Sequence, residues 1–269
     1  MKVAISGANG RMGQTLIRLL QGHSVLELGL AHEHKGADCL NVDSGLNSGI
    51  AANGVPITDE LDAQGFDLMI DFTVPQATMD NLEFCISHGK AMVIGTTGMT
   101  QDQIAKVESA GSSIPVILAA NTSVGVNLGA SLARKAAEVI GPYTDIEIIE
   151  AHHHHKVDAP SGTALFWGRE IADQLDINLE EEGVFARHGQ TGARKPGTIG
   201  FSTIRGGDIA GEHTVMFIGE NERLEITHKA TDRVIFGRGA LRAAEWLSEK
   251  VKQGEKGKFT MREVLNLID

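Results

Sequence analysis

The amino-terminal stretch constrains the fold most strongly, because a short apolar strand runs directly into a glycine-rich turn and a helix. Lys2–Ser6 reads as the strand, Gly7-Ala8-Asn9-Gly10-Arg11-Met12-Gly13 as the turn, and the apolar residues that follow recur at helical spacing. Glycines in such a turn allow a tight bend and a close approach of backbone to a pyrophosphate, which the helix N-terminus attracts. The spacing is G-x-x-G-x-x-G, so the turn alone indicates dinucleotide binding only weakly.

The second strand strengthens that interpretation. An apolar segment at residues 25–31 is followed by Glu33, at the place where an acidic residue contacts the ribose hydroxyls of a bound dinucleotide. His34 and Lys35 come next, and either could approach a ribose 2′-phosphate when protonated. The alternative is that all three are exposed loop charges. With the glycine turn in place, we predict that Glu33 and His34 contact the cofactor.

Strand-like and helical segments alternate through the first half of the chain, which predicts a parallel, doubly wound sheet with right-handed crossovers. Ligands of such sheets bind beyond the carboxyl ends of the strands. The residues at those ends could hold the nicotinamide and its ribose, although ordinary turn chemistry is the alternative. They are Gly95, Thr96 and Thr97 after one strand, and Ala119, Ala120, Asn121 and Thr122 after the next.

The pattern changes after a long helix at residues 126–140. A strand at 145–151 and a helix from Ser161 precede three strand-like runs in succession, which predicts an α+β domain with a largely antiparallel sheet. Helical periodicity then returns, and Thr260 begins a capping-box pattern. We therefore predict a Rossmann-type dinucleotide-binding domain from residues 1–123 and 233–269, and a substrate-binding and oligomerisation domain from residues 124–232. Two chain crossings would form a hinge.

Four consecutive histidines and a lysine, residues 152–156, lie between the predicted strand and the helix that begins near Gly162. If the chain stays extended, His152, His154 and Lys156 face one side. The helix N-terminus, with Gly162 and Thr163, is an anion site. Proton donors beside an anion site predict a pocket for a small acidic substrate that is protonated during the reaction.

Other interpretations of the histidine run are a metal site, a solvated loop and mere spacers. Ligands from adjacent strand residues rarely converge, and the two cysteines complete no tetrahedral set, so we predict no metal. We interpret His154 as a spacer.

Composition limits the partners and the compartment. The net charge of -11 argues against nucleic-acid and anionic-membrane surfaces. Two cysteines are too few for a disulfide framework, and the N-terminal residues form a strand rather than a signal peptide. No apolar run approaches the roughly 18 residues of a membrane span. We therefore predict a cytoplasmic protein without nucleic-acid or membrane partners.

Several segments with specific motifs are spread over essentially the whole chain. The most specific covers residues 147–164, with the His-Lys-Val-Asp-Ala-Pro-Ser-Gly-Thr-Ala core at 155–164, and the others are residues 3–13, 95–98, 197–200 and 211–213. These segments resemble the 4-hydroxy-tetrahydrodipicolinate reductase family, also called dihydrodipicolinate reductase. The resemblance implies an enzyme that reduces a cyclic imine dicarboxylate with NADH or NADPH, with loss of water, on the diaminopimelate route to lysine.

The resemblance also implies residue roles. His152 corresponds to the general acid/base, Lys156 to a proton donor, His153 to a substrate contact, and Gly162 with Thr163 to the cradle of a substrate carboxylate. The family's cofactor positions fall on Gly7, Ala8, Asn9, Gly10, Arg11, Met12, Glu33, His34, Gly95, Thr96, Thr97, Ala119, Ala120, Asn121 and Thr122. The resemblance further implies a homotetramer that assembles through the second domain.

Three positions depart from the family pattern. Many members have arginine where this chain has His34, and an imidazole clamps a 2′-phosphate less well than a guanidinium fork. We therefore predict that NADH serves at least as well as NADPH. Thr122 stands where an aromatic residue is frequent, and His154 where arginine is common. Competing functions are a dinucleotide-binding redox sensor without turnover, and another oxidoreductase acting on an acyclic substrate.

Overall fold

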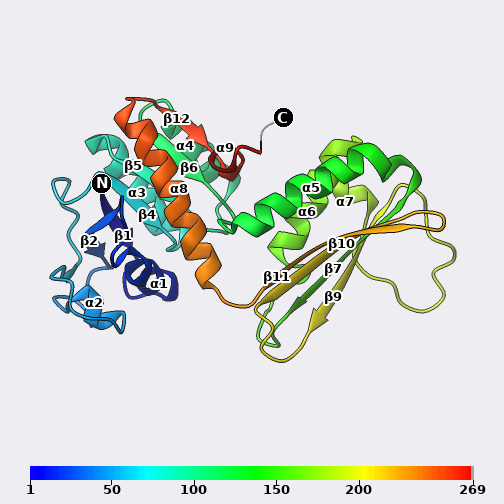
Figure 1. Cartoon of the computed structure of the whole chain (residues 1–269), viewed down its shortest axis with the longest axis horizontal. Coiled ribbons are helices and arrows are strands. Elements are labelled where there is room, and N and C mark those ends of the chain that lie inside the picture. Colours follow the sequence, from blue (N-terminus) through cyan, green and yellow to red (C-terminus); the bar gives the residue numbers. More distant parts are fainter. Residues whose placement is uncertain (268–269) are drawn as a thin grey trace. The chain divides into compact units, whose positions relative to one another are not determined.

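The computed structural model describes residues 1–267, which form two compact units (Figure 1). The first comprises Met1–Val124 together with the chain from Val234 onward, and the second comprises Gly125–Arg233. The chain therefore passes from the first unit to the second and returns.

The first unit contains a parallel sheet of seven strands. In spatial order they are β12 (Gly257–Phe259), β6 (Pro115–Leu118), β5 (Ala91–Ile94), β4 (Leu68–Asp71), β1 (Lys2–Ser6), β2 (Glu27–His32) and β3 (Ile57–Thr58). Strands β4 and β5 are buried along their whole length, as expected where helices cover both faces of a parallel sheet. The predicted doubly wound α/β architecture is confirmed.

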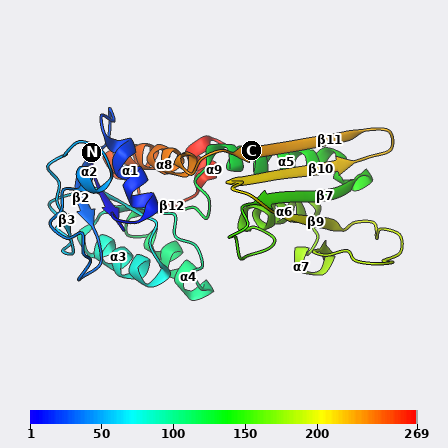
Figure 2. The same cartoon turned by 90° about the horizontal axis from the view of Figure 1, so that it is seen from below.

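Helices lie on both sides of this sheet (Figure 2). On one side, α1 (Arg11–Leu20) packs against α8 (Val234–Lys252), and Leu16 and Leu247 belong to the same apolar cluster. On the other side are α3 (Pro75–His88) and α4 (Gln101–Ala110).

Turn and cap residues set the helix boundaries. Helix α3 begins at Pro75 and ends where Gly89 adopts a left-handed conformation, and α4 is preceded by a capping box at Thr100. The predicted capping box at Thr260 precedes α9 (Met261–Leu265) and is confirmed.

The second unit is a five-stranded mixed sheet with helices on one face (Figure 1). Its strands, in spatial order, are β11 (Arg223–Ala230), β10 (Gly211–Ile218), β7 (Asp145–His152), β9 (Ile199–Arg205) and β8 (Gly183–Val184). Helices α5 (Val124–Ile140) and α6 (Gly162–Leu175) cover the inner face, where Trp167 is fully buried. The Trp167 indole donates to the Val126 carbonyl at 3.0 Å, and its ring occupies the space that a side chain at Gly129 would need.

The strand pairing in this sheet differs in one respect from the prediction, which was that successive strands pair antiparallel. Strand β10 pairs antiparallel with β7 and with β11, but β9 pairs with β7 in parallel. Helix α6 connects β7 to β9, so these elements form a βαβ crossover, and β7 lies between β9 and β10. Other elements are too short for periodicity to reveal, namely α2 (Ser44–Asn47), α7 (Leu179–Glu182), β3 and β8.

Candidate active site

The glycine turn of the first unit has the geometry of a phosphate-binding loop. Gly7 adopts φ +71°, and the Ala8 N–H donates to the His32 carbonyl at 3.0 Å, which ties the turn to β2. Gly10 precedes α1 and offers no side-chain cap, and the first turn of the helix contains no acidic residue. A side chain at Gly13 would overlap the Gly7 carbonyl oxygen. The turn therefore fits a pyrophosphate.

Glu33 lies beside this turn and is held by three donors. Its Oε2 accepts the Asn9 N–H at 3.0 Å, and its Oε1 accepts the His34 N–H at 3.0 Å and contacts the His34 ring at 2.7 Å. Burial alone would raise the pKa of Glu33, but these hydrogen bonds outweigh it and the pKa is lowered. An ionised acid fixed at the end of β2 fits the ribose hydroxyls of a dinucleotide.

The strand ends of the first unit direct two of the predicted side chains inward. The Thr96 hydroxyl donates to Asp71 at 3.2 Å and accepts from Thr78 at 2.8 Å. The Thr122 hydroxyl donates to the Phe236 carbonyl at 2.8 Å. Both side chains are buried and their hydroxyl hydrogens are already donated, whereas Thr97 and Ala120 are exposed.

Asp71 holds these strand ends together, and sequence reasoning assigned it no role. It is fully buried at the end of β4 and accepts hydrogen bonds from Thr73, Thr96 and Asn81. The sequence did contain a signal for its role, namely an acidic residue within an otherwise apolar strand. Next to it, Gly95 lies against the Phe72 ring, where no side chain would fit.

In the second unit, His152 ends β7 on the buried face of the sheet. Its Nδ1 lies 2.6 Å from Glu150 Oε2, and Arg205 on β9 donates both Nη atoms to the same carboxylate at 2.7 Å. Burial is the largest influence on His152 and lowers its pKa; Lys156 and Arg205 lower it further, and Glu150 opposes them. For Glu150, burial raises the pKa, but Arg205 and His152 outweigh it, so the carboxylate stays ionised.

The chain does not stay extended after His152, so the expected alternation is wrong beyond that residue. A turn follows, in which the Lys156 N–H donates to the His153 carbonyl at 3.1 Å. His154 is exposed, with Nδ1 2.9 Å from the Gly207 carbonyl, and His155 is exposed too. Lys156 pairs with Asp158 at 2.8 Å. His152 therefore remains on the inner face without the partners that the alternation predicted.

Ser161 connects this face to the start of α6. Its hydroxyl accepts the Ala164 N–H at 3.1 Å and contacts His213 Nε2 at 2.7 Å. Burial, followed by the neighbouring His152, lowers the pKa of His213 to about 3, so its ring is neutral. The space beside Gly162 in the first turn is open. Sequence reasoning gave no role to Glu150, Arg205 or His213, although polar residues on the buried face of an alternating strand were a signal.

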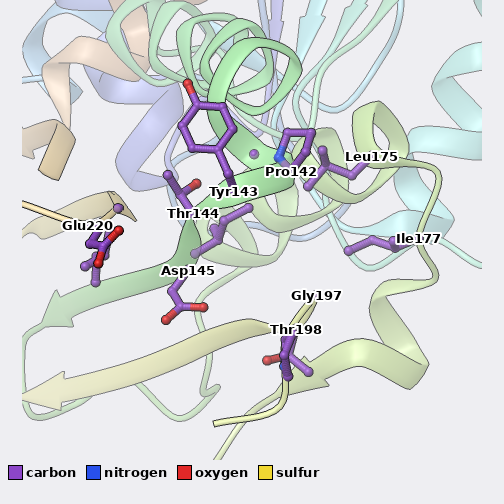
Figure 3. A pocket seen from close by; sticks show the side chains of 14 residues that line it. Pro142, Tyr143, Thr144, Asp145, Leu175, Ile177, Gly197, Thr198 and Glu220 are labelled. Atoms are coloured by element: carbon purple, nitrogen blue, oxygen red, sulfur yellow. The ribbon is translucent and has the colours of Figure 1, made fainter. Parts of the chain in front are cut away.

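A separate cavity of about 650 Å³ lies at the opposite end of β7 (Figure 3). Its lining includes Tyr143, Leu175, Asp145 and Glu220 but no histidine, lysine or cysteine, so it lacks the proton donors found near His152. Within residues 1–267, no group of three or more histidine, cysteine or acidic side chains is placed to hold a metal ion. In the same part of the chain, no helix has the length and apolar character needed to cross a membrane.

Comparisons with known proteins identify the family of the chain. A family model described as the C-terminus of dihydrodipicolinate reductase matches residues 125–265, and one described as its N-terminus matches residues 1–122. The chain is 25% identical to a dipicolinate-bound dihydrodipicolinate reductase from Paenisporosarcina sp. TG-14, with 97% of each chain covered and a TM-score of 0.72.

More distant structures share the fold alone. An amine dehydrogenase from Mycobacterium smegmatis is 11% identical, with 92% of each chain covered and a TM-score of 0.56. A probable dehydrogenase from Thermotoga maritima is 10% identical, with 99% of this chain and 93% of that chain covered and a TM-score of 0.59. The resemblance drawn from the sequence motifs is confirmed by the two family models, which together span both units. This chain belongs to the dihydrodipicolinate reductase family and is an oxidoreductase that uses NADH or NADPH.

Proposed function

We propose that the protein reduces 4-hydroxy-tetrahydrodipicolinate to tetrahydrodipicolinate, with loss of water, on the diaminopimelate route to lysine. The observation that carries the proposal is the buried Glu150–His152 pair, which is next to the Ser161-capped start of α6. Bound NADH or NADPH supplies the hydride, and the net reaction consumes one proton. The residues of the second unit therefore have to bind a dicarboxylate and manage that proton.

His152 is the group we assign to general acid/base chemistry. Glu150 accepts a hydrogen bond from Nδ1, which leaves Nε2 for the substrate. Because the pKa of His152 is lowered, its protonated form is a stronger acid than a free imidazolium. A bound dianion would favour that protonated form. Lys156 contributes positive charge and a further proton donor.

The start of α6 is the proposed cradle for a substrate carboxylate. Helix N-termini bind anions through their backbone N–H groups and the helix dipole. Gly162 and Thr163 form the first turn of this 14-residue helix, and the missing side chain of Gly162 leaves room for a ligand. We assign His153 to a second substrate contact.

For the cofactor, we propose the binding residues that the sequence predicts. The turn from Gly7 to Met12 would bind the pyrophosphate, and Glu33 and His34 would bind the adenosine ribose. The nicotinamide end would lie against 95–97 and 119–122, where the hydroxyls of Thr96 and Thr122 already donate to Asp71 and to the Phe236 carbonyl.

We also propose that the chain forms a homotetramer through the second unit. The face of the sheet opposite α5 and α6 carries no helix (Figure 1), and Ile149, Ile204 and Met216 point to that face by strand alternation. Ile204 is 51% exposed. Light scattering of the purified protein tests the proposal, which predicts four times the mass of one chain, whereas a monomer would contradict it.

The decisive variant is His152→Gln. We expect turnover to fall by roughly 10²-fold, the usual effect of losing a general acid, with little change in dinucleotide affinity. His154→Gln is the matched control, because that histidine neighbours the site but is exposed, and we expect it to keep full turnover. Unchanged turnover of His152→Gln would remove this residue from the mechanism.

A further inference from the structure

Glu150 is a buried carboxylate, and each of its two oxygens has several hydrogen-bond partners. Its side chain is 1% exposed. Oε1 accepts hydrogen bonds from the Ser161 N–H at 3.0 Å, the Thr203 hydroxyl at 3.2 Å and Arg205 Nη2 at 2.7 Å. Oε2 contacts His152 Nδ1 at 2.6 Å and Arg205 Nη1 at 2.7 Å. Such a saturated carboxylate can neither rotate nor exchange partners without breaking several hydrogen bonds.

This arrangement selects one tautomer of His152. An ionised carboxylate only accepts hydrogen bonds, so the ring has to place its hydrogen on Nδ1. Nε2 then carries the lone pair in the neutral ring and the exchangeable proton in the cation. Nε2 points toward Gly211, where a Cβ atom would lie only 3.1 Å away. The absence of a side chain at Gly211 thus keeps the reactive nitrogen uncovered.

Arg205 supplies the charge that balances Glu150. Its bidentate contact with the carboxylate balances the negative charge, which lowers the energetic cost of burying Glu150. Arg205 also donates to the Asp158 carbonyl at 2.6 Å, which fixes the guanidinium to the loop after β7. Without this counter-charge, Glu150 would favour a second proton on His152 more than it does with Arg205 in place.

The same carboxylate reaches the start of α6. The Ser161 N–H donates to Oε1, and the Ser161 hydroxyl accepts the Ala164 N–H in the first turn. Glu150 therefore holds both the imidazole of His152 and the residue that caps the helix. A proton-transfer group and an anion cradle joined through one side chain keep a fixed separation, as orienting residues behind catalytic groups do elsewhere.

We propose that Glu150 is a positioning residue that sets the tautomer of His152 and links it through Ser161 to the start of α6, with Arg205 as its counter-charge. The proposal rests on the proposed function, in which His152 exchanges a proton with the substrate. It adds a specific division of labour, because Glu150 orients the ring and Arg205 offsets the negative charge by which Glu150 favours protonation of that ring.

Other charged and titratable groups around His152 also influence its pKa. Lys156, in the loop after β7, and Arg205, on β9, both lower the pKa of His152. Asp158 pairs with Lys156 and moderates its effect. From β10, His213 places its ring 5.1 Å from the His152 ring, and burial lowers the pKa of the neighbouring His228 on β11. None of these groups contacts Nδ1 of His152 in place of Glu150.

The test is nuclear magnetic resonance of ring-labelled histidine in the full chain, with the His152 signals assigned by their loss in His152→Gln. In the wild type we expect the neutral ring to carry its hydrogen on Nδ1. Glu150→Gln can offer an amide N–H to Nδ1, so the form with hydrogen on Nε2 gains population and kcat falls roughly 10- to 100-fold. An unchanged tautomer in folded Glu150→Gln would overturn the proposal.

Arg205→Gln gives a second, independent measurement if Glu150→Gln does not fold. We expect the pKa of His152 to rise in this variant, because the carboxylate charge is no longer balanced, and the pH profile of kcat/KM shifts in the same direction. An unchanged pKa would overturn the role of Arg205. Glu182→Gln is the matched control, since Glu182, on α7 of the same unit, is also a carboxylate paired with a cation, Lys195, at 2.7 Å. It should leave the His152 signals and the pH profile unchanged.

The proposed function of His152 and the positioning role of Glu150 can be contradicted separately. If His152→Gln retains full turnover, the assigned function of His152 is wrong, whatever the tautomer. If His152→Gln loses turnover while Glu150→Gln keeps both the tautomer and kcat of the wild type, only the positioning role is wrong.

Discussion

Replacing Gly13 with alanine tests whether the glycine turn is shaped for close packing and cofactor binding. A Cβ atom at this position would overlap the Gly7 carbonyl oxygen and lie 2.8 Å from the Ala8 Cα. Both neighbours are backbone atoms, so the turn itself would have to move. Gly13 lies inside α1, where helix propensity alone would favour alanine by about 1 kcal/mol.

The two effects oppose each other, and their sizes decide the sign. Forcing a methyl group into a packed site costs about 1–3 kcal/mol, and the upper end applies here because no side chain can rotate away. Subtracting the gain in propensity leaves a net destabilisation of roughly 2 kcal/mol. For a unit of this size, that lowers the melting temperature by roughly 4–8 °C.

Thermal unfolding and dinucleotide titration measure the two consequences. Because the turn has to shift, we expect the Kd for NADH to rise at least about tenfold, which is a loss of 1.4 kcal/mol in binding. Gly206→Ala is the control, since a Cβ there meets no atom within 4 Å and should change stability by less than about 0.5 kcal/mol. A Gly13→Ala protein that is as stable as the wild type and binds NADH equally well would refute the reasoning.

Three further predictions follow from single residues. We expect steady-state kinetics to favour NADH or to show no preference, because this chain has His34 where many family members have an arginine that binds the 2′-phosphate of NADPH. A preference for NADPH above tenfold would contradict this. His34→Arg should raise the rate with NADPH. The pKa of His213 is near 6.5 in the unfolded chain, and burial lowers it to about 3 in the folded protein. Between these two values the unfolded state binds more protons, so the contribution of His213 to the free energy of unfolding is present above pH 6.5. It is lost as the pH falls below 6.5, by about 1.4 kcal/mol per pH unit. Urea unfolding should therefore show a flatter pH dependence between pH 6.5 and about 5 in His213→Gln, and equal slopes would count against the burial argument. Burial raises the pKa of Cys85 to about 12, so this thiol should resist thiol reagents until the protein unfolds; rapid labelling of the folded protein would be contrary evidence.

The fold of the first unit was predictable because its strands and helices alternate with strong periodicity. Segments such as Ala91–Ile94 and Gln101–Ala110 are a strand and a helix of this alternating series. The second sheet was harder, since strand pairing depends on contacts between distant residues. Nothing local in residues 199–205 indicates that β9 pairs with β7 rather than with the strand that follows it.

The candidate site was predictable in outline only. The histidine run and the helix start at Ser161 were visible, because both are continuous in sequence. The pairing of Glu150 with Arg205 spans 55 residues and depends on the register between β7 and β9, which no local pattern encodes. The turn after His152 likewise depends on distant backbone groups, such as the Ile209 carbonyl that accepts the His153 N–H at 2.8 Å.

The most direct test of the proposed function is the loss of reduced-nicotinamide absorbance when NADH or NADPH is mixed with the protein and the cyclic substrate. The substrate can be generated in place from pyruvate and aspartate semialdehyde by the preceding synthase. We predict rapid, substrate-dependent oxidation of the cofactor that requires both the synthase reaction and an intact His152. Protein that binds the dinucleotide but oxidises none of it in the presence of this substrate would contradict the proposed function.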